Sequence, residues 1–169
     1  MEALNLMSRT EWEEILDRFA RQVRMAACLT DEGGAIILCQ RERRPLCVAV
    51  RANKDARSAI CSQVSDSMTQ TMRSTLKPDV GICDAGLLRV AVPVIRLGFL
   101  VGQVTACGLT CAEEDVSTFL LGRMLDLPEE RVQQLAGLTP LGIMDDLKVS
   151  GMRLFRELNP LDESRPAAR

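Results

Sequence analysis

The sequence predicts an α+β fold in which helices pack around an antiparallel sheet. Its 169 residues follow the order helix, strands, helices, strands, helices. Residues 27–39 and 87–105 each match the pattern of a hairpin, with two apolar runs joined by a turn. A single helix cannot cover two hairpins, so we expect a sandwich of helices around the sheet. The length suits one domain with its own core.

The first expected element is a helix over residues 9–26. Thr10 is expected to cap this helix, with Glu13 in the capping-box position three residues later. Trp12 is interpreted as a core residue because it lies on the apolar stripe of the helix. This stripe recurs at three- and four-residue steps and consists of Trp12, Ile15, Leu16, Phe19, Val23 and Ala26.

The first hairpin is expected over residues 27–39, with its turn at the Asp-Glu-Gly-Gly sequence of residues 31–34. A short helix should follow over residues 45–51, since proline is favoured at a first helical position. A longer helix is expected over residues 55–76, because Pro78 prevents it from running on. One face of that helix carries Ile60, Val64, Met68 and Met72.

The central hairpin is expected from Leu87 to Ile95 and from Phe99 to Thr105, two segments rich in branched apolar residues. Pro93 cannot donate a ladder hydrogen bond, so we expect a sheet edge or a bulge at this point.

Three helices are expected after the sheet, over residues 113–125, 128–137 and 139–158. The last one is amphipathic and is interpreted either as a lever or homodimer contact, or as a helix that closes the core. We expect one domain over residues 1–158. The remaining residues, 159–169, should form a loose tail because they contain two prolines, several charges and little apolar surface.

Charge and hydropathy exclude several classes of protein. The formal net charge is −2, with acids and bases mixed along the chain, which argues against a nucleic-acid-binding surface. The basic cluster at residues 41–44 is interpreted as a solvated loop. No apolar run reaches the roughly 18 residues of a membrane helix. The acidic N-terminus also lacks the layout of a secretory signal. We therefore expect a cytoplasmic protein without direct contact to nucleic acid or membranes.

The chain contains no histidine and seven cysteines. The lack of histidine excludes Ser-His-Asp and Cys-His catalysis, and every zinc site that uses imidazole. Without an export signal, the cysteines indicate thiols or metal ligands rather than a disulfide framework. Cys28 and Cys39 lie on strand-like segments and are interpreted as core residues.

Three cysteines occupy positions that suit a binding site. Cys47 lies at the start of a short helix, Cys61 early in the long helix, and Cys83 in a glycine-bracketed turn that enters a strand. Cys107, at the far end of the paired strand, is the candidate fourth member. Four thiolates suit zinc or a 4Fe–4S cluster. The chain has no Cys-x-x-Cys pair, so small buried side chains are the alternative interpretation.

Several short motifs follow one another between Pro45 and Leu109. They are Cys47, Cys61, Cys-Asp-Ala-Gly-Leu at residues 83–87, Ala-Val-Pro-Val at 91–94, and Val-Gly-Gln-Val at 101–104. In this order and spacing the chain resembles the PocR-type sensory domain, a family named for a propanediol-utilisation regulator. The likeness covers roughly residues 10–155, which is nearly the whole chain.

The resemblance implies a PAS- or GAF-like fold and a role as the sensor of a transcription regulator or signalling kinase. It implies small ligands, such as short alcohols and diols, bound near Cys47, Cys61 and Cys83. Asp84 stands where the family often has histidine, and its carboxylate can accept a hydrogen bond from a hydroxyl ligand. The resemblance also strengthens the metal hypothesis, with Cys107 as the fourth ligand.

The sequence therefore predicts a sensory domain and not an enzyme. A small molecule, or a cluster held by Cys47, Cys61, Cys83 and Cys107, is expected between the sheet and the helices. Its presence should bias two packings of the domain and so reach a signalling or transcriptional output. A protein-interaction module with structural cysteines is the alternative. A thiol-dependent enzyme is a weaker one, since a carboxylate or lysine would have to replace histidine as the base.

Overall fold

A computed structural model describes residues 3–112 and 115–160 of the chain. The strands are β1 (Ala26–Asp31), β2 (Ile36–Gln40), β3 (Asp79–Ile82), β4 (Leu87–Arg96), β5 (Phe99–Cys111) and β6 (Leu141–Gly142). They form one sheet in the order β2-β1-β5-β4-β3, with β6 beside β5. Neighbouring strands are antiparallel except β5 and β6, which run parallel. Both predicted hairpins are therefore confirmed.

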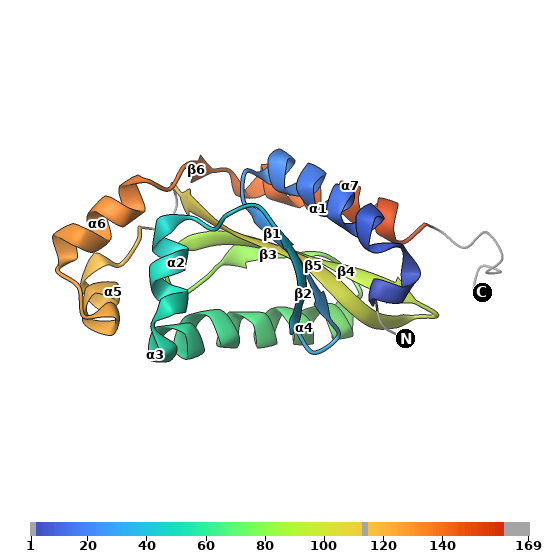
Figure 1. The fold of residues 1–169 in the computed structure, drawn as a ribbon, viewed down its shortest axis with the longest axis horizontal. Coiled ribbons are helices and arrows are strands. Elements are labelled where there is room, and N and C mark those ends of the chain that lie inside the picture. Colours follow the sequence, from blue (N-terminus) through green and yellow to red (C-terminus); the bar gives the residue numbers. More distant parts are fainter. Residues whose placement is uncertain (1–2, 113–114, 161–169) are drawn as a thin grey trace.

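Helices cover both faces of the sheet, which confirms the predicted α+β sandwich. They are η1 (Ala3–Leu6), α1 (Arg9–Val23), α2 (Pro45–Ala52), α3 (Lys54–Ala56), η2 (Arg57–Ser62), α4 (Gln63–Thr75), α5 (Thr118–Leu125), α6 (Glu129–Gly137) and α7 (Met144–Leu158). α1 and α7 lie on one face, and α2, α3 and α4 lie on the other (Figure 1). α5 and α6 pack at one end of the sheet.

The main hydrophobic core lies between the sheet and the pair α1 and α7. Successive side chains of a strand face opposite sides, and the residues of β4 that face this core are Leu88, Val90, Val92 and Val94. Trp12 is fully buried here, as predicted, and its indole Nε1 donates a hydrogen bond to the Ala3 carbonyl at 3.1 Å. This bond joins η1 to α1.

The cap of α1 differs from the prediction. Ser8, and not Thr10, is the N-cap: its hydroxyl accepts a hydrogen bond from the Glu11 amide at 3.3 Å. The Glu11 carboxylate in turn accepts one from the Ser8 amide at 2.7 Å. Glu13 instead forms an ion pair with Arg9 at 2.9 Å. Two overlapping capping-box patterns are present in the sequence, and the helix begins at the earlier one.

The last helix begins later than predicted. α7 starts at Met144 and not near Thr139, because β6 pairs with the end of β5 before the helix begins. Gly142 fits so closely in this pairing that an added Cβ would lie 2.7 Å from a methyl carbon of Leu109. Tertiary pairing therefore outweighs the local signal of a threonine followed by a proline.

Two further element boundaries differ from the prediction. α5 begins at Thr118 and not at residue 113, and residues 113–114 lie outside the described part of the chain. β5 extends to Cys111, beyond the predicted end at Thr105. Its additional length gives β6 and the start of β4 a partner.

Pro93 lies where β4 has a neighbour on one side only, which confirms the predicted edge. β3 pairs with β4 only as far as Ala91, so the later residues of β4 face no strand on that side. The side chain of Asn159 takes the place of a strand there. It accepts a hydrogen bond from the Ile95 amide at 2.6 Å and donates one to the Pro93 carbonyl at 2.8 Å. Asn159, expected in a loose tail, is therefore held firmly; residues 161–169 lie outside the described part.

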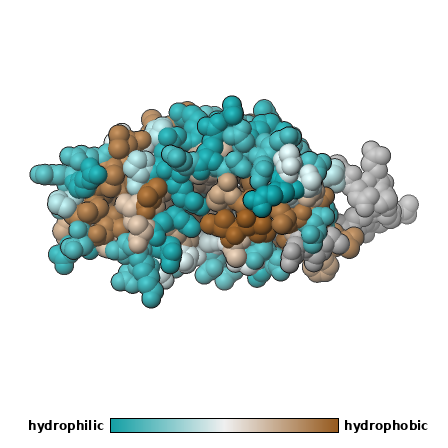
Figure 2. All heavy atoms as spheres, in the orientation of Figure 1, coloured by the Kyte–Doolittle hydropathy of each residue, from teal (hydrophilic) through white to brown (hydrophobic). Residues whose placement is uncertain are grey.

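The visible surface is mostly hydrophilic (Figure 2). Apolar side chains gather between α1 and α4, where the edge strand β2 lies (Figures 1 and 2). Ile36 of β2 is about half exposed. No helix in the described residues is both long enough and apolar enough to cross a membrane.

Candidate functional site

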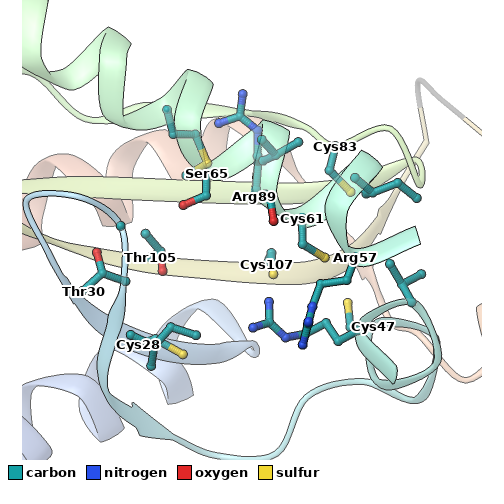
Figure 3. Close-up of a pocket in the computed structure, with 18 of the residues that line it drawn as sticks. Cys28, Thr30, Cys47, Arg57, Cys61, Ser65, Cys83, Arg89, Thr105 and Cys107 are labelled. Carbon is teal, nitrogen blue, oxygen red and sulfur yellow. The ribbon is translucent and has the colours of Figure 1, made fainter. Parts of the chain in front are cut away.

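A cavity of about 430 Å³ lies on the face of the sheet opposite the main core. Its floor is formed by β1, β4 and β5, and its walls by α2, η2, the start of α4 and the β3–β4 turn. Cys47, Cys61, Cys83 and Cys107 all line it. Figure 3 shows these four side chains at one end, with Thr30, Ser65 and Thr105 at the other. We call it the cysteine cavity.

The alternation of side chains along the strands explains which residues reach the floor. β1 contributes Ala26, Cys28 and Thr30, while Ala27 and Leu29 between them enter the main core. β5 contributes Thr105 and Cys107 in the same way. Cys28 pairs with Thr105 across the ladder, so the two strands present their polar side chains side by side.

A bulge in β5 lies directly after Cys107. Cys107 pairs with Arg89 of β4, and Leu109 pairs with Leu88, so Gly108 is an extra residue between two paired positions. Gly108 has φ of +121°, a conformation that favours glycine. An added Cβ there would lie 3.4 Å from the Cys47 sulfur. Cys107 already faces the cavity by alternation, and the glycine at the bulge lets the Cys47 sulfur approach the strand beside it.

Wide helical turns bring Cys61 and Arg57 to the cavity. The predicted helix over residues 55–76 is a continuous helical run of α3, η2 and α4, and η2 within it is π-helical. Such wide turns are uncommon and occur frequently at functional sites. Arg57 and Cys61 both belong to η2 and line the cavity.

Cys83 is held by the tight turn between β3 and β4. Its amide donates to the Leu87 carbonyl at 2.9 Å, and its carbonyl accepts from the Gly86 amide at 2.8 Å. Gly86 has φ of +78°, and an added Cβ would lie 2.8 Å from the Asp115 carbonyl oxygen. The neighbouring Asp84 is exposed and does not line the cavity.

The four thiols differ in acidity because their surroundings differ. Cys47 donates a hydrogen bond to Cys107, and this bond, together with burial, raises the pKa of Cys47 strongly. The same bond, opposed by burial and supported by nearby arginines, lowers the pKa of Cys107 to about 7. Burial raises the pKa of Cys61 and of Cys83. Cys107 is the exposed member of the four, and the surface that it exposes lines the cavity.

This difference predicts the pH dependence of alkylation. The thiolate is the reactive form, so iodoacetamide should modify Cys107 with a half-maximal rate near pH 7. Cys47→Ala removes the hydrogen bond and should move that midpoint up towards the ordinary thiol value of about 8.5. Cys47→Ser retains a donor and should move it less. Peptide-resolved mass spectrometry of the rate at each pH measures this, and identical midpoints in all three proteins would contradict it.

Cys28 and Cys39 form a disulfide, which the sequence analysis did not expect. They lie opposite each other in the β1–β2 ladder, with Cα atoms 4.1 Å apart. Cys28 is buried, as predicted, but Cys39 is exposed because β2 is an edge strand. The Arg43 guanidinium contacts both sulfur atoms, at 3.2 Å and 3.4 Å.

The arginines of the cavity were not predicted from the sequence. Arg43, Arg51, Arg57 and Arg89 all line it. Arg43 belongs to the cluster interpreted as a solvated loop, yet it is half-buried. Arg89 offered a signal, since it lies in an otherwise apolar strand segment and a charge there needs a partner. Its guanidinium donates to Asp79 at 2.5 Å.

The cavity brings the four predicted metal-ligating cysteines together, but not as a coordination sphere. Among residues 3–112 and 115–160, no three cysteine or carboxylate side chains are grouped closely enough to hold a metal ion. The arrangement therefore does not fit zinc or a 4Fe–4S cluster, and metal binding stays a prediction from the sequence.

The sequence matches one family model, described as a sensory domain found in PocR, over residues 5–136. No curated protein matches it.

Solved structures show a weak overall likeness. The inducer-binding domain of PobR from Acinetobacter, a double mutant in complex with 3-hydroxybenzoic acid, is 10% identical with a TM-score of 0.38 and covers 79% of this chain and 99% of its own. HmgR from Pseudomonas aeruginosa is 10% identical with a TM-score of 0.35, over 90% of this chain and 69% of its own. MglB in a tetrameric arrangement is 11% identical with a TM-score of 0.35, over 75% of this chain and 85% of its own.

Proposed function

The chain belongs to the family of sensory domains found in PocR, and we propose that it senses a small molecule held in the cysteine cavity. The observation that carries this proposal is the cavity itself. Its volume of about 430 Å³ lies within the range of roughly 300–1,000 Å³ typical of small-molecule sites. Apolar walls that include Ile60, Met68 and Leu87 adjoin thiols, hydroxyls and guanidiniums. Such a mixture suits a ligand with a short carbon chain and one or two polar groups.

The sheet offers a route from the cavity to α7. Thr105 and Cys107 of β5 line the cavity, whereas Val104 packs into the core that α1 and α7 cover, and Ala106 belongs to both. A ligand that shifts β5 therefore acts on both faces of the sheet. α7 packs against β4 and β3 through its buried side, and Val149 on its other side is exposed. We assign α7 the role of output element or contact with a second copy.

Binding without catalysis is the role that the chemistry of the cavity favours. The chain has no histidine, and the group hydrogen-bonded to Cys107 is another thiol, which keeps its proton. Cys107 thus has arginines and a thiol as neighbours and no general base. A nucleophilic cysteine enzyme needs such a base, or another proton acceptor, to complete its cycle.

A thermal-shift screen of short alcohols, diols, aldehydes and carboxylates tests this function. A ligand at about 100 times its Kd adds about 2.7 kcal/mol of stability. For a domain of this size that raises Tm by about 5–10 °C. At least one compound class should produce such a shift. No shift across the whole panel would overturn the proposal and favour a protein-interaction module.

A metal analysis of the purified protein tests the metal hypothesis from the sequence. Protein purified without oxygen should be assayed for iron, sulfide and zinc, and its visible spectrum recorded. Stoichiometric metal that is lost in Cys47→Ala and Cys83→Ala would replace the small-molecule proposal with a metal-based sensor. Metal-free protein with titratable thiols at all four positions would leave the small-molecule proposal in place.

A further inference from the structure

The cysteine cavity contains more positive charge than its surroundings neutralise. Four arginines line it, Arg43, Arg51, Arg57 and Arg89, against a single carboxylate, Asp66. Arg89 is paired with Asp79. Within the described part of the chain, no carboxylate forms an ion pair with the other three arginines. Three guanidiniums therefore border the cavity without a carboxylate partner.

These guanidiniums come from different elements and converge on one end of the cavity. Arg43 precedes α2, Arg51 lies in its last turn, and Arg57 begins η2. Arg43 and Arg51 both act on the thiols of Cys107 and Cys61. Figure 3 shows Arg57 reaching towards Cys47, at the same end. The convergence gives that end a positive potential, and walls of low dielectric strengthen such a potential.

The wall of the cysteine cavity contains a hydrogen-bond donor without a partner among the described residues. Nε of Arg89 is buried and has no hydrogen-bond partner among the described residues. A guanidinium presents five N–H donors in a planar fork that matches a carboxylate or phosphate. Charge-assisted bonds of this kind are about twice as strong as neutral ones. An alcohol offers no charge to such a site, whereas a carboxylate satisfies it.

We infer that the ligand of the cysteine cavity is a small organic carboxylate. This inference rests on the proposed function and names the class of molecule that the cavity takes. The carboxylate lies at the end bordered by Arg43, Arg51 and Arg57. Its carbon chain follows the apolar wall that includes Ile60 and Met68. A further hydroxyl on the ligand would reach the opposite end, where Thr30, Ser65 and Thr105 lie (Figure 3).

Matched pairs of ligands isolate the contribution of the charge. Isothermal titration calorimetry at pH 7.5 would compare hexanoate with 1-hexanol, and 4-hydroxybutanoate with 1,4-butanediol. Each pair shares its carbon number and differs in the terminal group. The carboxylate should bind at least tenfold more tightly than its alcohol. Equal affinities within both pairs, or tighter binding of the alcohols, would overturn the inference.

Arginine variants locate the effect. Arg57→Gln and Arg51→Gln should each reduce the preference for carboxylate by about tenfold, and Arg51→Lys should restore part of it, since charge returns without the fork. Arg57 is exposed, so its variant should keep the wild-type Tm even where Arg51→Gln does not. Arg153→Gln is the matched control, because Arg153 is exposed on α7, across the sheet from the cavity. A preference that survives both glutamine variants would contradict the inference.

The outcomes also separate this inference from the proposed function. If alcohols bind and carboxylates do not, the carboxylate inference is refuted, while the proposal of a small-molecule sensor is retained. Binding of neither class, together with a flat thermal-shift screen, would refute both.

Discussion

Trp12→Ala is expected to lower the free energy of unfolding by about 3–5 kcal/mol, the range for removing a large aromatic side chain from a core. Trp12 is fully buried between α1 and the sheet. Its loss also leaves the Ala3 carbonyl without the indole donor, which loosens η1. A domain is stable by only about 5–15 kcal/mol. The variant should therefore lose a large share of its stability.

Urea denaturation followed by far-UV circular dichroism measures this effect. Fluorescence cannot follow the variant, because Trp12 is the only tryptophan of the chain and there is no tyrosine. Trp12→Phe is the matched control, since it retains most of the ring volume and loses the indole hydrogen bond. It should cost clearly less than the alanine variant. A loss below about 1 kcal/mol for Trp12→Ala would show that the site collapses around the smaller side chain.

Cys107→Leu is expected to abolish ligand binding while the fold remains intact. Cys107 lies on the floor of the cysteine cavity and exposes its side chain there, so a larger side chain takes up space that a ligand needs. Because the leucine extends into open volume, the free energy of unfolding should change by less than the roughly 1–3 kcal/mol that an enlarged side chain costs in a filled core. The Kd for hexanoate and for 1-hexanol should rise at least 30-fold.

Cys107→Ala separates occupied volume from thiol chemistry. Alanine enlarges the cavity, so hexanoate should still bind within a few-fold of the wild-type Kd. Calorimetry on both variants, with Tm measured alongside, gives the comparison. Wild-type affinity in Cys107→Leu would place the binding site outside this cavity. Equal loss in both variants would assign the sulfur itself a direct contact with the ligand.

Local patterns predicted the elements of the fold well. The apolar stripe of α1 and the turns of both hairpins depend on neighbouring residues, and the structure confirms them, except that the helix ends at Val23 and Ala26 of the predicted stripe lies in β1. The predicted start of α7 was wrong because β6 forms only when β5 is beside it. The pairing of Cys28 with Cys39 had a local signal that was overlooked: the two lie equally far from the Gly33-Gly34 turn.

The candidate site was only partly predictable. The resemblance selected Cys47, Cys61 and Cys83, with Cys107 beside them, and all four line one cavity. Whether these cysteines and Asp84 bind a ligand or metal stays a prediction. The arginines could not be found in this way, since arginine is normally a surface residue. Arg51 and Arg89 are far apart in the sequence, and only the tertiary fold brings both to the cavity.

The wide turns of η2 also fix the phase of the long helical run. A strict four-residue repeat passes through it: Ala56, Ile60, Val64, Met68 and Met72. In a uniform α-helix four residues turn by about 400°, so this repeat would drift about 40° around the axis at each step. π-helical turns contain more residues and rotate less per residue, which offsets part of the drift. A one-residue deletion in η2 would rotate the helix before it by about 100° relative to α4. The arginine side of the cavity would then no longer face its apolar side.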